Sequence, residues 1–112
     1  MNLRFSSGEV RVRLERTDAV RLFETGKIQE SFAYPGGNVR VEVVCVTIPI
    51  PVLDVISIGA QAFQVSISKM KLTDMFEGKT KSELECLNDS VFCGPGQFQR
   101  LRFEIDRFTH NE

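Results

Sequence analysis

Three segments of this chain alternate apolar and polar residues one by one. They read VRVRL over residues 10–14, VRVEV over 39–43 and LRFEI over 101–105. A period of two is that of a β-strand with one buried face, since successive side chains point to opposite sides. Apolar faces of this kind need a second layer to cover them. The alternation therefore predicts sheet structure around a shared core.

On the polar side of these strands the charges are mixed. Arg11 and Arg13 face outward from the first segment, and Arg40 and Glu42 from the second. We expect mainly cross-strand pairing between opposite charges. The alternative is an anion-binding face made of Arg11, Arg13 and Arg40. With 14 basic and 15 acidic residues the net charge is -1, which disfavours nucleic acid as a partner.

Two stretches predict short helices. In RTDAVRLFETGK (16–27), Thr17 can cap the first turn and Gly26 can end the helix. In SKMKLTDMFEGK (68–79), Ser68 and Gly78 have the same two roles. Helices of two to three turns need packing against a sheet to persist.

These two stretches also resemble each other at an offset of 53 positions, with Phe23 matching Phe76 and Leu22 matching Met75. Any two strand-helix units are somewhat alike, so two explanations stay open. The chain contains either an internal duplication or two unrelated units of similar pattern.

Glycine and proline mark the turns. PGGN (35–38) separates an extended segment, 28–34, from a strand, 39–46, and predicts a hairpin; CGPGQ (93–97) predicts another turn. Prolines at 49 and 51 place the segment IPIP at a strand end or sheet edge, followed by a short strand.

The apolar segment around these prolines, residues 46–59, is too short and interrupted for a membrane helix, so we expect no membrane association. Its many apolar side chains instead predict self-association, as a homodimer, through Ile48, Ile50 and Val52.

We predict one domain spanning residues 1–112, of the α+β class. Its sheet is expected to be a curved antiparallel sheet or a partly open β-barrel of about five to seven strands, with two short helices.

Residues suited to catalysis are few. His110 is the only histidine, and the odd number of cysteines (Cys45, Cys86 and Cys93) is typical of buried thiols in a reducing compartment. Glu83 and Glu85 could share one strand face, but a solvated face explains them as well. We expect no catalytic residues, no metal site and no cofactor.

VRVRLERTDAVRLFETGKIQES near the start, with LRFEIDRF about 70 residues later, resembles a family of short bacterial proteins of uncharacterised function. The resemblance covers about the first 30 residues and, more loosely, the last strand. It implies a bacterial cytoplasmic protein and supplies no functional residues. The chain ends soon after Phe108, without the extended acidic tail associated with that family.

The function that follows is a non-enzymatic interaction or assembly module, with a protein partner or a second copy. Two alternatives remain: a small-ligand-binding barrel, and a weak RNA- or anion-binding module using the arginine strand. The opening residues lack the apolar core of a signal peptide, so we expect a cytoplasmic location.

Overall fold

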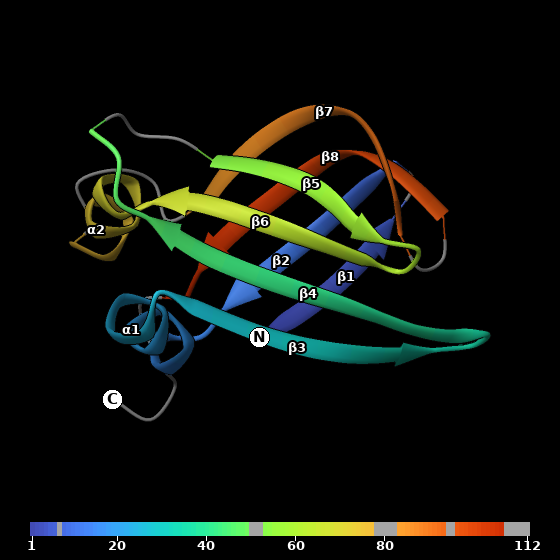
Figure 1. Cartoon of the computed structure of the whole chain (residues 1–112), viewed down its shortest axis with the longest axis horizontal. Helices are drawn as coiled ribbons and strands as arrows, with labels where there is room; N and C mark the ends of the chain where they lie inside the picture. Colours follow the sequence, from blue (N-terminus) through green and yellow to red (C-terminus); the bar gives the residue numbers. More distant parts are fainter. Residues whose placement is uncertain (7, 50–52, 78–82, 94–95, 107–112) are drawn as a thin grey trace.

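The strands form two four-stranded sheets that pack face to face, with both helices at one end (Figure 1). The computed structural model describes residues 1–6, 8–49, 53–77, 83–93 and 96–106, and over 83–93 and 96–97 it describes the backbone alone. The elements are β1 (Asn2–Ser6), β2 (Glu9–Leu14), α1 (Arg16–Thr25), β3 (Lys27–Tyr34), β4 (Gly37–Val46), β5 (Leu53–Gly59), β6 (Ala62–Ser68), α2 (Lys69–Glu77), β7 (Glu83–Cys93) and β8 (Gly96–Ile105).

The α+β class and the two short helices are confirmed. The first sheet has the order β1-β2-β8-β7 and the second the order β3-β4-β6-β5, and the sheets are not closed into a barrel. Each sheet contains one parallel pair, β2 with β8 and β4 with β6, so the sheets are mixed where antiparallel pairing was expected. Hairpin turns dictate only antiparallel neighbours, whereas these parallel pairs join strands distant in the sequence.

The two halves of the chain repeat one arrangement of hairpin, helix and hairpin. The helix of each half follows directly on the second strand of its first hairpin, β2 or β6. In both sheets this strand pairs in parallel with the last strand of the other half. A backbone hydrogen bond repeats as well. The N–H of Arg100 donates to the carbonyl oxygen of Gly8, and the N–H of Arg40 donates to that of Gln61, which lies 53 positions after Gly8. Each sheet therefore contains one hairpin from each half, so the two halves exchange hairpins.

The buried residues follow the same repeat. Each helix has two fully buried apolar residues, and those of α2 follow those of α1 by 53 positions: Leu72 corresponds to Ala19, and Met75 corresponds to Leu22. Between the sheets the largest buried side chains are aromatic, and they include Phe63, Phe98 and Phe103. As predicted, Val10, Val12 and Leu14 of β2 and Leu101, Phe103 and Ile105 of β8 point into this core.

Both helices occur where the sequence predicts them, with one correction. Ser68 caps α2, since its Oγ accepts a hydrogen bond from the N–H of Lys71 at 3.2 Å. Gly26 ends α1 in the left-handed region at φ 82°. Thr17, however, lies inside α1, and the N-cap is Glu15, whose N–H donates to Oδ2 of Asp18 at 3.0 Å. The aspartate is three residues beyond the cap and satisfies its backbone, so the threonine is not needed.

The expected hairpin between β3 and β4 is present, with Tyr34 paired to Gly37 across the turn. At φ 104°, Gly36 has a conformation that disfavours other residues. The strand expected after the prolines is β5, which lies at the edge of the second sheet. The turn residues 94–95, the stop at Gly78 and the segment 50–52 lie outside the described residues.

Among the described residues, no helix combines the length and apolar character needed to cross a membrane.

Candidate anion-binding surface

A row of arginines crosses three neighbouring strands on the outer face of the first sheet. Arg11 of β2 is paired in register with Arg4 of β1 on one side and with Arg102 of β8 on the other. Residues in register on adjacent strands point to the same face, with Cβ atoms about 5 Å apart. Three guanidinium groups are therefore held side by side by the backbone pairing itself.

Only part of this positive charge is balanced. Nε of Arg102 lies 3.5 Å from a carboxylate oxygen of Glu9. Arg13, one step along β2, lies 3.6 Å from Glu104 and 3.1 Å from Asp106, and its Nη2 donates to the aspartate. These contacts confirm the expected cross-strand pairing for Arg13.

Arg4 and Arg11 differ from their neighbours. In the described part of the chain neither guanidinium has a hydrogen-bond acceptor or a carboxylate partner. Like charges directly opposite on adjacent strands cost about 0.2 to 1 kcal/mol. The pair is thus a small cost to folding that no contact among the described side chains offsets.

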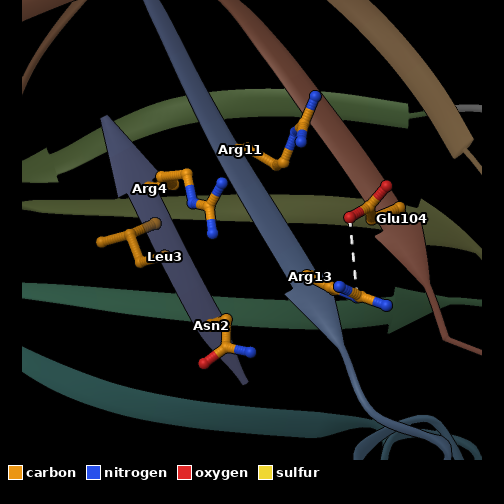
Figure 2. A pocket seen from close by; sticks show the side chains of 6 residues that line it. All are labelled: Asn2, Leu3, Arg4, Arg11, Arg13 and Glu104. Atoms are coloured by element: carbon orange, nitrogen blue, oxygen red, sulfur yellow. Dashed lines mark ion pairs between the residues drawn. The ribbon is translucent and has the colours of Figure 1, made fainter. Parts of the chain in front are cut away.

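A shallow pocket of about 250 Å³ lies over this pair. Figure 2 shows the arginine side chains on the outward face of β1 and β2, with the ion pair between Arg13 and Glu104 at one side. Its lining residues are Asn2, Leu3, Arg4, Arg11, Arg13 and Glu104. Because Glu104 is engaged by Arg13, Arg4 and Arg11 leave a net positive charge in the pocket. Guanidinium groups bind phosphate and carboxylate oxygens through paired N–H donors.

Arg40, the third arginine predicted for this face, lies on β4 in the second sheet and is not brought together with Arg11 and Arg13. Its Nη2 lies 3.8 Å from Oε2 of Glu42. The two sheets place their outer faces on opposite sides of the core, so one ligand cannot contact all three arginines.

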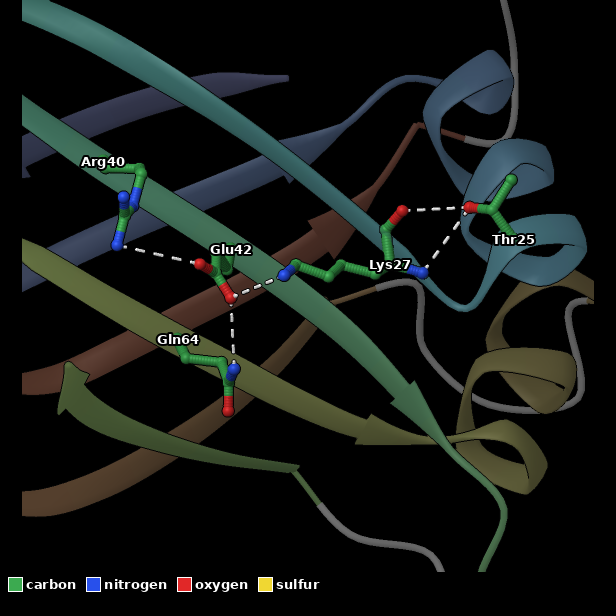
Figure 3. A network of polar contacts seen from close by, with 5 residues as sticks. All are labelled: Thr25, Lys27, Arg40, Glu42 and Gln64. Atoms are coloured by element: carbon green, nitrogen blue, oxygen red, sulfur yellow. Dashed lines mark hydrogen bonds and ion pairs between the residues drawn. The ribbon is translucent and has the colours of Figure 1, made fainter.

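Glu42 is the centre of a polar network on that second face (Figure 3). Nε2 of Gln64 donates to Oε1 of Glu42 at 3.2 Å, and Nζ of Lys27 lies 3.4 Å from the same oxygen. The glutamate is only 8% exposed. The hydrogen bond from Gln64, with the charges of Lys27 and Arg40, lowers the pKa of Glu42 against the opposing effect of burial. This carboxylate is held ionised by its neighbours, and the network is structural.

The remaining candidate residues are separated or lie outside the described side chains. Ile48, two residues beyond the end of β4, is 37% exposed, whereas Ile50 and Val52 lie outside the described residues. Cys45 is half-buried, and burial raises the pKa of its thiol, which disfavours the nucleophilic thiolate. The side chains of Glu83, Glu85, Cys86 and Cys93, and all of His110, are not described.

No group of three or more metal-ligating side chains occurs within the described ranges.

Arg4 was missed by the sequence reasoning. The segment NLRFS alternates polar and apolar residues, and in the structure Leu3 and Phe5 accordingly turn inward against the core while Arg4 is exposed. The sequence also indicates a turn at Gly8, and in the structure Gly8 lies between β1 and β2 with φ 72°. A hairpin centred there would have placed Arg4 opposite Arg11.

Comparison of the chain with protein-family models, with curated proteins and with solved structures finds no match.

Proposed function

We propose that the chain is a non-enzymatic interaction module that binds a phosphate-bearing ligand through Arg4 and Arg11. The observation that carries this proposal is the position of the two guanidinium groups. They are in register on β1 and β2, line one pocket and have no acidic partner among the described side chains. A phosphate group would accept hydrogen bonds from both and remove their mutual repulsion.

The ligand is expected to be small or weakly held. Two arginines supply far less charge than an extended nucleic-acid interface, and the net charge is -1. Phosphate carried by a small molecule and phosphate carried by RNA have the same local chemistry. A small phosphate compound and an RNA are therefore compared, because only the RNA has further phosphates that extend beyond the pocket.

The test is a titration with inorganic pyrophosphate, followed by calorimetry, and with a labelled single-stranded 12-nucleotide RNA, followed by anisotropy. Replacing Arg4 and Arg11 together by Gln is expected to weaken binding of either ligand at least tenfold. With about two phosphates neutralised, raising salt from 50 to 200 mM should weaken RNA binding roughly sevenfold.

The matched control replaces Arg21 of α1 and Lys71 of α2 by Gln, which removes the same charge away from the pocket. Equal weakening by the control variant would show a general charge effect and contradict the site. Binding of RNA without pyrophosphate would place the ligand in the nucleic-acid class. Failure of both probes to bind would overturn the proposal.

A second candidate function is self-association as a homodimer. It is supported by two exposed apolar side chains of the second sheet and its connections: Ile48, two residues beyond the end of β4, is 37% exposed, and Ile56 on the edge strand β5 is 49% exposed. Replacing both by Asp should convert a dimer to a folded monomer, as measured by light scattering at micromolar concentration. Met70→Asp, at an exposed position on α2, is the control. A monomeric parent protein would exclude this role.

The interior of the molecule offers less support for a small-ligand-binding barrel. The sheets are not closed into a barrel, and buried aromatic side chains occupy the space between them. The resemblance to short bacterial proteins and the cytoplasmic location stay predictions.

A further inference from the structure

The arginine pocket on the first sheet also contains a carboxylate. Glu104 of β8 lines the pocket and lies in register with Arg13 of β2. Nε of Arg13 lies 3.6 Å from Oε1 of Glu104, and its Nη2 lies 3.1 Å from Oδ2 of Asp106. Figure 2 shows the Arg13 side chain next to Glu104, with the ion pair dashed. The charge of this third arginine is therefore balanced by carboxylates at the end of β8.

A second carboxylate borders the arginine pair at its other end. Glu9 precedes Arg11 by two residues on β2, so both side chains point to the outer face, about 7 Å apart along the strand. The carboxylate of Glu9 lies 3.5 Å from Nε of Arg102. Arg11 thus lies between Glu9 on one side and the ion pair of Glu104 on the other.

This arrangement limits the charge and the length of an anion that fits. Of the three arginines that line the pocket, only Arg4 and Arg11 lack a carboxylate partner among the described side chains. Their Cβ atoms are about 5 Å apart, close enough for both guanidinium groups to contact one phosphate. A longer polyanion centred there would bring further negative charge toward the carboxylates at either end.

Phosphate groups of two kinds respond differently to such a site. A terminal phosphate carries between one and two negative charges at neutral pH and has three free oxygens, all of which accept hydrogen bonds. A phosphodiester has one negative charge and two free oxygens, and its chain continues on both sides toward further phosphates. A site can reject one of two similar ligands by placing like charge where only that ligand extends. The two glutamates are placed in this way.

We propose that the ligand of Arg4 and Arg11 is a terminal phosphate group, and that Glu9 and Glu104 exclude phosphodiester chains. This inference rests on the proposed function and names the chemical class of its ligand. Both glutamates act by repelling further phosphates, and Glu104 in addition keeps Arg13 engaged. A terminal phosphate occurs on small phosphorylated compounds and at the 5′ end of a nucleic acid, and its local chemistry is the same in both.

The test compares two single-stranded 12-nucleotide RNAs of one sequence, one with a 5′ phosphate and one with a 5′ hydroxyl. Binding to the full chain is followed by anisotropy of a 3′ label at one salt concentration. The parent protein should bind the phosphorylated RNA at least fivefold more tightly. Replacing Arg4 and Arg11 together by Gln should remove this preference. Equal affinities of the parent protein for the two RNAs would overturn the inference.

Replacing Glu9 and Glu104 together by Gln should tighten binding of the hydroxyl RNA at least fivefold and reduce the preference below twofold. The matched control replaces Glu30 and Asp54, exposed acidic residues outside the pocket, by Gln and Asn. The control should keep the preference of the parent protein. Equal changes in both double variants would show a general effect of net charge and contradict the role of the two glutamates.

Circular dichroism checks that both double variants are folded. If the first is not, Glu104→Gln alone serves as the second variant, because it leaves the contact between Glu9 and Arg102 in place. This single variant should at least halve the preference for the phosphorylated RNA. A preference equal to that of the parent protein would contradict the role of Glu104.

Two further probes separate this inference from the proposed function and identify the source of the phosphate. Binding of pyrophosphate through Arg4 and Arg11, with equal affinities for the two RNAs, would keep the proposed function and overturn this inference. Failure of every probe would overturn both. Phenyl phosphate that binds as tightly as the phosphorylated RNA would assign the site to small compounds, and tighter binding of that RNA to nucleic-acid ends. Either result supports a terminal phosphate.

Discussion

The outer faces of the two sheets have equivalent pairings but different central residues. In the first sheet Arg11 of β2 lies in register with Arg102 of β8, and in the second Gln64 of β6 lies in register with Glu42 of β4. In the second sheet one carboxylate collects its neighbours into a network, whereas in the first the arginines lie side by side. The same backbone arrangement thus supports a network around a carboxylate in one sheet and, among the described side chains, a like-charged arginine pair in the other.

The two sheets also differ at the neighbouring edge strand, β1 in the first sheet and β5 in the second. Arg4 of β1 lies in register with Arg11, whereas Ile56 of β5 lies in register with Gln64. An apolar neighbour costs nothing electrostatically, but a second cation does. The second sheet forms the equivalent pairing without arginines, so strand pairing of this kind does not need a cation at either position. This supports the proposal that Arg4 and Arg11 bind a ligand.

The largest effect on stability is expected from a substitution that gives the second sheet adjacent cations, as in the first. Glu42→Arg would place a cation at a position that is 8% exposed, beside Lys27 and Arg40. A buried charge without a counterion costs about 3 kcal/mol or more. We expect the free energy of unfolding, measured in urea, to fall by that amount.

Gln64→Arg is the control for this substitution, because it places a cation next to the existing carboxylate of Glu42. Its effect should lie within about 0.5 kcal/mol of zero. An equally small loss for Glu42→Arg would mean that the network contributes little to the second sheet.

A smaller loss of folding stability is expected at acid pH. Because the pKa of Glu42 is lowered in the folded protein, the unfolded chain binds this proton more tightly. The stabilisation is therefore complete above the ordinary pKa of about 4.5 and is lost as pH falls through the lowered value. Glu42→Gln should cost about 1 kcal/mol at neutral pH and flatten this part of the acid profile.

The measurement is urea unfolding of both proteins from pH 6 down to pH 3. Glu30→Gln, at an exposed position on β3, is the matched control and should keep the parent profile. Parallel profiles for the parent and Glu42→Gln would show that other carboxylates determine the acid response.

The smallest effect has the opposite sign. Arg11→Gln copies the residue at the equivalent position, Gln64, and removes the like-charge pair with Arg4. We expect a gain of about 0.2 to 1 kcal/mol in unfolding free energy together with weaker phosphate binding. In a double-mutant cycle Arg4→Gln should add almost nothing further. Two independent losses of stability would indicate that the arginines pack for structural reasons.

Much of the local structure could be predicted from the sequence. Strict alternation identified which residues of β2 and β8 face the core, and Ser68 and Gly26 were correctly expected to bound helices. These features depend on neighbouring residues along the chain. The N-cap was wrong because Thr17 belongs to a residue type that is preferred at caps and Glu15 does not. Glu15 occupies the cap through its reciprocal contact with Asp18, which residue type alone does not reveal.

The pairing of distant strands could not be predicted in the same way. Alternation in β2 and β8 says which face is buried but not that the two strands are parallel neighbours. For the same reason Arg40 was grouped with Arg11 and Arg13, although it lies on the other sheet. The burial of Glu42 was also hidden, because its cover comes from Lys27 and Gln64 on two other strands.

The exchange of hairpins between halves has a consequence for how the chain folds. Local hairpins such as β1 with β2 can form in microseconds, but Glu9 of β2 must also find Arg100 of β8 at the far end of the sequence. Contacts of such long range slow folding, since chain entropy is lost before they form. Neither half completes a sheet by itself, so we expect the halves to fold and unfold together in one cooperative transition.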